Sequence, residues 1–456
     1  MSVEQSLLFD EAAKIAAEGP KPIAFTYEVT IHVDKKNIDA LFVVERELVA
    51  NFIENYCDNL NIEVAVPMGV LEYDLIPNKT LLEITVRKIA LTEGIMAAKD
   101  NNGVIQTQRY KATLYDNKSG LVEGNNPLTA TKEISERGMF ENVRFQLLPV
   151  IIHQIRKTTV GNNYHDISGI ELLVFLLTKH SQVTARDSDT SVKGVTVLGR
   201  PSKIKKEQII IPHLTKLVDV GDYIHNNCGG LYSAGFKAYL QKQQWFVFAP
   251  YDLKAYDSSP KTLTIINIPA NRLASTERTY RETPTQVILL VTGQVKHFDF
   301  SEQEQLNQGN GVRFVNADAV PAGFVTVENN KMFVNKARNV QEYLAENRAE
   351  GINNVVESPE AITSNPLVEM GRLARRTGSF IQAVWENAND NVIYPGMPVR
   401  YLYLQNNRAE ELYGTLVGVQ AHETATNVNV SNRRFISNTA LTIFVQRAVK
   451  LTDAAT

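Results

Sequence analysis

The stretch PGMPVRYLYLQNNRAEELYGTLVGV, residues 395–419, contains two apolar runs separated by a short polar break. The side chains of the first run alternate in two sets, Val399, Tyr401 and Tyr403 on one face and Arg400, Leu402 and Leu404 on the other. A period of two is typical of a strand in a twisted antiparallel sheet. The break Asn406-Asn407-Arg408 has the composition of a hairpin turn. We therefore expect strands over 399–404 and 412–419.

The rest of the C-terminal half continues this strand-rich pattern. Strand-like runs cover 263–268, 287–295, 311–315 and 441–449. The polar stretch 336–366, rich in Asn and Glu, has the pattern of a connecting segment, helical at best. No catalytic constellation lies near the long C-terminal strands, which is typical of a chain that joins a larger assembly.

Residues 22–125 predict a β-rich module that contains one helix. The module begins with a strand pattern, in which polar residues alternate with Phe25, Tyr27, Val29 and Ile31. Further strands are expected at 41–44, 62–66, 70–76, 81–89 and 109–115. Between these strands, a helix is predicted over 45–59. Four apolar residues recur there at helical spacing: Leu48, Phe52, Tyr56 and Leu60. This arrangement suits a barrel or strongly curled sheet whose helix covers one opening or edge.

Residues 126–265 mix the two periodicities. We expect a strand at 140–148, helices at 150–157 and 170–177, and a cap for the second helix at Asp166 or Ser168. After an exposed loop at 184–194 and an apolar run at 209–212, a helical pattern passes through 214–224 and ends at Cys228-Gly229-Gly230. A strand follows at 245–248. Residues 1–19 form a short amphipathic helix, either on the chain's own core or as a docking arm.

Composition sets the broad class of the protein. The chain has 456 residues, 44% hydrophobic and 21% charged, as expected of a folded globular protein of several domains. A net charge of -3 gives no global reason to expect binding to nucleic acid or an anionic membrane. Cys57 and Cys228 lack CxxC spacing, which excludes a disulfide framework and a cysteine-only zinc site. No apolar run is long enough for a membrane span, and residues 1–5 lack the pattern of a signal peptide, so we expect production and use without Sec export.

The search for catalytic chemistry gives weak candidates only. The cluster at 297–302, with His297, Asp299 and Glu302, could hold a metal, although this spacing is more typical of a strand-to-turn segment. The glycines at 308–312 indicate a turn, because a strand rather than a helix follows them. Glu277 and Glu282 flank two arginines and indicate a salt-bridged surface. We predict no catalytic residue, no cofactor and no metal.

Two further groups have a structural and a functional interpretation. Arg372, Arg375 and Arg376 could contact nucleic acid or an acidic partner, but their spacing favours one exposed helical face. Trp245 and Trp385 are better candidates for core or interface anchors than for base stacking.

Three stretches together resemble the baseplate hub subunit of contractile-tailed bacteriophages and, more distantly, the hub region of type six secretion spike proteins. The first, 25–31 through 61–87, is similar to the layout of tail-tube-like domains. The second, 209–252, has an apolar run, a helix, a Gly–aromatic turn at 230–236 and an aromatic strand at 246–249. The third runs from Tyr394-Pro395-Gly396 through Val419.

The resemblance implies an α+β, β-rich fold of tail-tube-like curled β-barrel domains with covering helices and a smaller mixed α/β insertion. The implied segments are an N-terminal arm or helix (1–21), a first tube-like domain (22–125), a mixed hub domain (126–265), a β-rich segment (266–335), a connecting segment (336–366) and the C-terminal part of a second tube-like domain (367–456). Interface roles are expected in the C-terminal hairpin, at Val399, Tyr401, Tyr403, Tyr413, Leu416 and Val419.

The resemblance also implies a biological role. Three copies would form a central hub in the virion tail baseplate, assembled in the host cytoplasm, with six tube-like domains in a ring. The implied partners are the spike protein, the tail tube, other baseplate proteins and phage DNA passing without sequence specificity through the lumen. The alternatives are another ring-forming tail protein, such as a tube initiator, and a tail-associated cell-wall hydrolase that uses carboxylates.

Overall fold

The computed structural model describes most of the chain. It covers residues 3–22, 24–34, 36–91, 104–115, 140–184, 192–269, 271, 277–291, 295–298, 325–328, 331–335, 342–346, 365–376, 378–405, 408–425 and 434–447. Three predicted features lie wholly or mainly outside these residues: the loop at 184–194, the turn at 308–312 and the strand at 311–315. Of the cluster at 297–302, only the first two residues are described.

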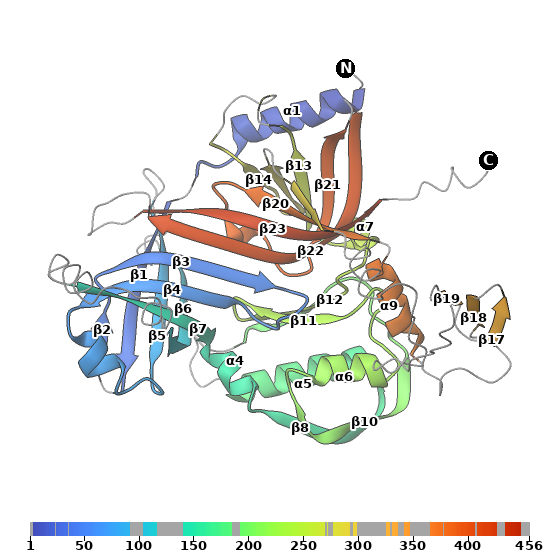
Figure 1. Ribbon diagram of the computed structural model, residues 1–456, viewed down its shortest axis with the longest axis horizontal. Helices are drawn as coiled ribbons and strands as arrows, with labels where there is room; N and C mark the ends of the chain where they lie inside the picture. The colour runs from blue at the N-terminus through green and yellow to red at the C-terminus, as the bar shows by residue number, and fades with distance from the viewer. Residues whose placement is uncertain are drawn as a thin grey trace.

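A closed sheet, here called the first barrel, contains strands from both ends of the chain (Figure 1). Its N-terminal strands are β1 (Ala24–Val33), β3 (Phe42–Asn51), β4 (Asn59–Pro67), β5 (Glu83–Leu91), β6 (Val104–Leu114) and β7 (Phe140–Pro149), with β2 (Lys36–Asp39) paired to β1. Its C-terminal strands are β22 (Arg408–Ala425) and β23 (Phe435–Arg447). The order β22-β3-β4-β7-β6-β5-β1-β23 closes because β22 also pairs with β23.

The interior of the first barrel follows from strand alternation. Every second residue of β1 is buried, starting with Phe25 and Tyr27, and the same alternation fills the barrel from β4 and β5. Between β1 and β23, Phe25 pairs with Phe435. At one end, the π-helix η1 (Leu71–Leu75) packs Leu75 against this core.

The second curled sheet uses β22 and β23 again. Its other strands are β13 (Thr262–Asn267), β14 (Tyr280–Glu282), β15 (Gln286–Val291), β16 (Val295–Phe298), β20 (Ser379–Trp385) and β21 (Pro398–Gln405). They follow the order β14-β15-β13-β21-β22-β23-β20-β16. The sheet curls over its own core, since Tyr280 near one end contacts Trp385 near the other, with ring centroids 5.6 Å apart.

The strands β22 and β23 therefore belong to both sheets. β22 has 18 residues: its first part, 408–415, pairs with β21, and its last part, 418–424, pairs with β3. A bulge between Leu416 and Gly418 lies where the strand passes from one sheet to the other. The hairpin prediction at 399–419 is confirmed, and the structure extends its second strand into the first barrel.

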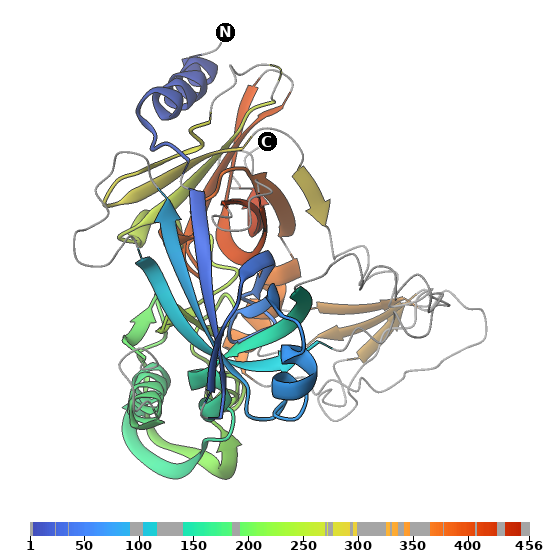
Figure 2. The same ribbon diagram turned by 90° about the vertical axis from the view of Figure 1, so that its left-hand side faces the viewer.

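A mixed α/β domain connects the two sheets in sequence and has a core of its own. Its helices are α4 (Val150–Ile155), α5 (Gly169–Thr184) and α6 (Val220–Asn227), and the short α7 (Ala255–Ser258) follows it. Its strands form the ribbon β8 (Thr159–Ser168) with β10 (Lys205–Lys216), and a small sheet of β9 (Gly194–Val197), β11 (Lys237–Gln241) and β12 (Gln244–Phe248). In Figure 2 this domain lies below the first barrel, at the opposite end from α1.

The remaining helices contact the second sheet in different ways. Helix α1 (Val3–Glu18) packs Leu8, Ala12 and Ile15 on the outer face of β13 and β15. Helix α9 (Pro366–Arg376) precedes β20, and η4 (Asp390–Val392) follows it. A separate sheet consists of β17 (Val325–Glu328), β18 (Lys331–Asn335) and β19 (Glu342–Glu346), so part of the stretch 336–366 is a strand.

The predicted cap of α5 is Ser168. Its hydroxyl lies 3.3 Å from the Glu171 backbone nitrogen, while the Glu171 carboxylate accepts from the Ser168 backbone nitrogen at 3.0 Å. This reciprocal pair is a capping box. We expect Ser168→Ala to lower the free energy of unfolding by about 1 kcal/mol, measured by urea denaturation. Ser168→Thr, which retains the hydroxyl that donates to the Glu171 carboxylate at 2.8 Å and accepts from the Glu171 backbone nitrogen, should stay close to wild type; equal losses in both variants would contradict the capping role.

Three predicted elements are wrong. The helix predicted over 45–59 is instead the second half of β3, a turn and the start of β4. The strand predicted at 70–76 is the π-helix η1, whose apolar residues cover the end of the barrel. The helix predicted from Leu214 begins only at Val220, because β10 continues to Lys216 in its pairing with β8. The fold class itself, α+β and β-rich with curled sheets and covering helices, is confirmed.

Candidate functional site

The six predicted interface residues divide into two groups. Val399, Tyr401, Leu416 and Val419 are buried in the core of the second sheet, where they contact residues of their own chain. Tyr403 and Tyr413 are half-buried. Tyr413 packs edge-on against Tyr256, with ring centroids 5.6 Å apart. The hairpin thus serves the chain's own core first, and of the six predicted residues only Tyr403 and Tyr413 reach its surface.

The most unusual feature of the structure is a group of charged side chains inside the first barrel. Glu423 on β22 is fully buried, and its Oε2 lies 3.0 Å from Nη1 of Arg46 on β3. Its Oε1 accepts from Nζ of Lys88 on β5 at 3.4 Å. The hydroxyl of Tyr27 on β1 also donates to Glu423. One carboxylate therefore binds side chains from three other strands of the barrel.

Two further groups extend this set, which we call the charge cluster: Tyr27, Arg46, Lys88, Lys242, Asp390 and Glu423. Lys88 Nζ lies 3.9 Å from Oδ2 of Asp390, the first residue of η4. Lys242 at the tip of the β11–β12 hairpin donates to the backbone oxygen of Asp390 at 2.7 Å. The charge cluster therefore joins the first barrel, the second sheet and the mixed domain.

Burial and neighbouring charges shift the pKa values of Arg46 and Asp390 in opposite directions. Burial alone would raise the pKa of Asp390, but the neighbouring Lys88, Arg46 and Lys242 hold it below its usual range. For Arg46, burial is the largest single influence and would lower the pKa, but Glu423, Tyr27 and Asp390 together outweigh it and raise the pKa. Burial lowers the pKa of Lys242 and raises that of Tyr27. Arg46 and Asp390 thus stay ionised at neutral pH because they compensate one another's environment.

A second acid lies at the edge of the charge cluster. Asp58 accepts from the Tyr239 hydroxyl at 2.9 Å, which ties the turn before β4 to strand β11 of the mixed domain. Burial raises the pKa of Asp58, and the bond from Tyr239 works against that shift. Burial also raises the pKa of Tyr239. This contact is a second polar connection between the first barrel and the mixed domain.

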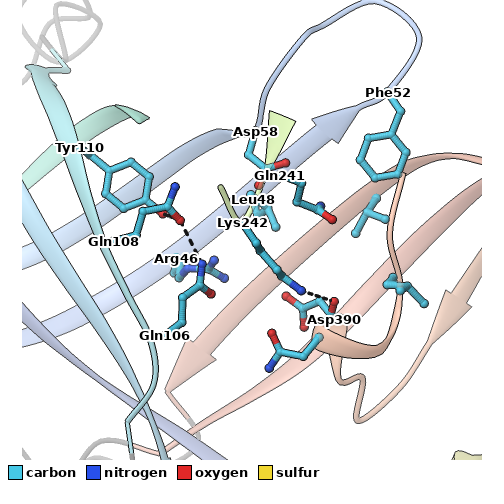
Figure 3. Close-up of a pocket in the computed structure, with 13 residues that line it drawn as sticks. Arg46, Leu48, Phe52, Asp58, Gln106, Gln108, Tyr110, Gln241, Lys242 and Asp390 are labelled. Carbon is cyan, nitrogen blue, oxygen red and sulfur yellow. Dashed lines mark hydrogen bonds between the residues drawn. The ribbon is translucent and has the colours of Figure 1, made fainter. Parts of the chain in front are cut away.

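A small cavity lies between these parts (Figure 3). Polar side chains dominate its lining, among them Arg46, Gln106, Gln108, Gln241 and Lys242. Its volume of about 30 Å³ is enough for roughly one or two water molecules. Substrate sites in proteins are larger, on the order of 300 Å³ or more. The cavity is therefore a small polar gap at the junction between domains rather than a substrate pocket.

The other candidate residues have structural surroundings. Glu282 pairs with Lys261 at 2.7 Å, and Arg281 pairs with Glu18 of α1 at 3.2 Å, as expected of a salt-bridged surface. Trp245 and Trp385 are both fully buried core residues. Arg375 on α9 is exposed, and the side chains of Arg372 and Arg376 lie outside the described residues.

Within the described part of the chain, no group of three or more His, Cys, Asp or Glu residues is arranged to hold a metal ion. Cys57 is buried, Cys228 is half-buried, and both are free thiols. No described helix has the length and apolar character needed to cross a membrane.

Sequence patterns did contain a signal for the charge cluster. Arg46 falls in phase with the buried residues Leu48 and Ala50 of its strand. Lys88 continues the phase of Ile84 and Val86, and Glu423 that of Val419 and Ala421. A charged residue at an inward position is rare unless it is paired. Three such residues of opposite sign on separate strands are the pattern that could have predicted a buried network.

No protein-family model and no curated protein matches this chain. Solved structures do match it. A tail protein from Neisseria meningitidis is 12% identical with a TM-score of 0.42, covering 94% of this chain and 99% of that chain. A 43 kDa tail protein of prophage MuSo2 from Shewanella oneidensis is 9% identical with a TM-score of 0.44, covering 92% and 98%.

A component of the type VI secretion system of E. coli is 8% identical with a TM-score of 0.37, covering 92% of this chain and 77% of that chain.

Proposed function

We propose that this chain is a structural component of a bacteriophage tail baseplate, and that three copies form the central hub. In this role the hub joins the spike to the sixfold tail tube, contacts other baseplate proteins and surrounds the channel for phage DNA. The protein is then a non-enzymatic part of the virion, assembled in the host cytoplasm.

The observation that supports the proposal is the pair of curled β domains that share β22 and β23. Because the same two strands run through both domains, their relative orientation is fixed within one chain. A threefold ring of such chains presents six curled domains, which is the number that a sixfold tube requires. The charge cluster fits this role, since it holds both curled domains and the mixed domain in one arrangement.

Ring formation needs contact surfaces between subunits, and the edge strands of the sheet provide one such surface. Among the described strands, β14 pairs only with β15, and β16 only with β20. The outer side of β14 lies against Gly19 at the end of α1, so β16 is the strand that presents one side on which a strand of a neighbouring subunit could pair. For side-chain contacts we propose the β21–β22 hairpin, with Tyr403 and Tyr413 at its surface and Val399, Tyr401, Leu416 and Val419 supporting it from the core.

The mass of the purified protein tests the proposal. We expect multi-angle light scattering to give three copies of the 51.0 kDa chain, either alone or after addition of the spike protein. Trimers in negative-stain images should then show a ring with six similar lobes. A hexamer would favour a tube initiator instead, and a monomer under both conditions would contradict the hub.

A further inference from the structure

His225, near the end of α6, is a buried histidine with one backbone hydrogen bond on its ring. It is 6% exposed, and its Nδ1 lies 3.0 Å from the backbone nitrogen of Leu231. A backbone N–H can only donate, so Nδ1 is the unprotonated nitrogen and the ring is neutral. The ring also stacks on Phe236, with centroids 5.6 Å apart and planes at 29°.

The same turn supports the first half of α9. Asn365, just before the helix, donates from Nδ2 to the His225 carbonyl oxygen at 2.7 Å and accepts from the Leu367 backbone nitrogen at 3.1 Å. Gly230 has φ +86°, and a Cβ there would lie 2.6 Å from Cβ of Leu367. The helix therefore packs directly on the turn that the His225 ring holds.

A second close contact at a glycine extends the packing of α9 on the mixed domain. A Cβ on Gly371 would lie 2.7 Å from the backbone nitrogen of Gly235, which leads into β11. The backbone of α9 thus approaches the backbone of the mixed domain too closely for any side chain. Packing this close depends on the exact course of the segment 228–236.

We propose that His225 is a proton-sensitive anchor, and that protonation of its ring releases α9 from the mixed domain. A protonated Nδ1 is a donor, and it would face the donor of Leu231 in a buried site. The hydrogen bond between His225 and Leu231 that shapes the turn would be lost. The turn at Gly230 would then no longer offer the surface on which Leu367 packs. This device is independent of the function proposed above.

The charges around the ring act in the same direction. Burial, and after it the positive charge of Lys237 on β11, lowers the pKa of His225 to about 4. Lys237 also lies 3.8 Å from Asp222 of α6. Asn365, which precedes α9, and Phe236 are neutral neighbours, and the nearby part of α5 is apolar at Leu173.

The direction of the pH effect follows from linkage. In the proposed released state the turn at 225–231 also opens and exposes the ring, which would then titrate near its ordinary pKa of about 6.5. Between that value and about 4, the released state binds the proton more strongly than the docked state. Docking is therefore complete at neutral pH and is lost as the pH falls. From about pH 7.5 to about pH 4.5, the ratio of released to docked helix should rise on the order of 100-fold.

Hydrogen exchange of the full chain tests the anchor. Protection factors of α9 amides, corrected for intrinsic exchange rates, should fall by on the order of 100-fold between these pH values in the wild type. In His225→Asn, an amide oxygen can accept from Leu231 at any pH, so protection of α9 should be nearly constant. The amides of α5 serve as the reference for unfolding of the mixed domain. Equal losses in both proteins, or parallel losses in α5, would overturn the proposal.

A matched pair of glycine variants tests the packing of α9 on this turn at a single pH. Gly229 and Gly230 both have positive φ, +91° and +86°, so alanine is strained at either position. A Cβ at 229 meets only the flexible end of Lys206, whereas a Cβ at 230 meets Leu367. At neutral pH, Gly230→Ala should therefore expose α9 amides more than Gly229→Ala does. Equal exposure in the two variants would contradict packing of α9 on this turn.

Discussion

Replacing Glu423 by glutamine should lower the free energy of unfolding by about 3–5 kcal/mol. The carboxylate is fully buried, and it compensates two buried cations, Arg46 and Lys88. Glutamine keeps the shape but removes the charge, so both cations remain in the barrel with one negative partner fewer. An uncompensated charge in a protein interior is among the most destabilising changes known for a single residue. Urea denaturation followed by circular dichroism measures the loss.

The same strand offers a matched control. Glu411 on β22 also pairs with an arginine, Arg400, at 2.7 Å, but both side chains are more than one third exposed. Glu411→Gln should change the stability by about 0–1 kcal/mol, because water solvates the remaining charge. A triple variant with Glu423→Leu, Arg46→Met and Lys88→Met should recover much of the stability lost in Glu423→Gln. Similar losses for Glu423→Gln and Glu411→Gln would contradict the view that burial of the charge cluster determines its importance.

Local sequence patterns predicted the strands that have one buried and one exposed face. The run 399–404 alternates in sequence, and in the structure β21 buries Val399 and Tyr401 while Leu402 packs toward α1. The capping box of α5 is likewise contained in four consecutive residues, from Ser168 to Glu171. Such elements are predictable because the contacts that decide them lie within a few residues.

The failures have a common cause in contacts between distant residues. The apparent helical stripe from Leu48 to Leu60 combines residues of β3, a turn and β4. Residues 45–51 form a strand because they pair on one side with β4 and on the other with β22, some 370 residues later, in which Leu48 lies opposite Ala421. The sharing of β22 and β23 by two sheets has the same origin. One sequence read by local periodicity contains no information on which strands will pair.

The charge cluster was missed for a related reason. Arg46, Lys88 and Glu423 each look like an ordinary surface charge until the phase of the strand is compared with the buried residues beside it. Arg46 and Glu423 belong to neighbouring strands, but the sequence separates them by almost the whole chain. A search for charged residues at inward positions would have found Arg46, Lys88 and Glu423, though not that they meet.

Gly414→Ala should be the second most destabilising change, with a loss of about 3 kcal/mol, the upper end of what overpacking costs. A Cβ at this position of β22 would lie 1.7 Å from the backbone oxygen of Phe444 on β23. The obstacle is backbone rather than a movable side chain, so the methyl group fits only if the two strands separate. Thermal or urea unfolding of the purified variant measures the effect.

Gly418→Ala is the control on the same strand, because its Cβ would meet its nearest atom, Cβ of Thr442, at 3.3 Å, which a small shift relieves. The pair also tests whether the shared strands couple the two curled domains. Gly414 lies in the part of β22 that pairs with β21, in the second sheet, yet the same strands close the first barrel. If β22 and β23 make the two domains one cooperative unit, Gly414→Ala should lower the midpoint of a single transition seen by every probe. Loss of exchange protection in β13 and β21 with unchanged protection in β4 and β7 would instead mean that the domains unfold separately, and that the hairpin connects them without coupling their stabilities.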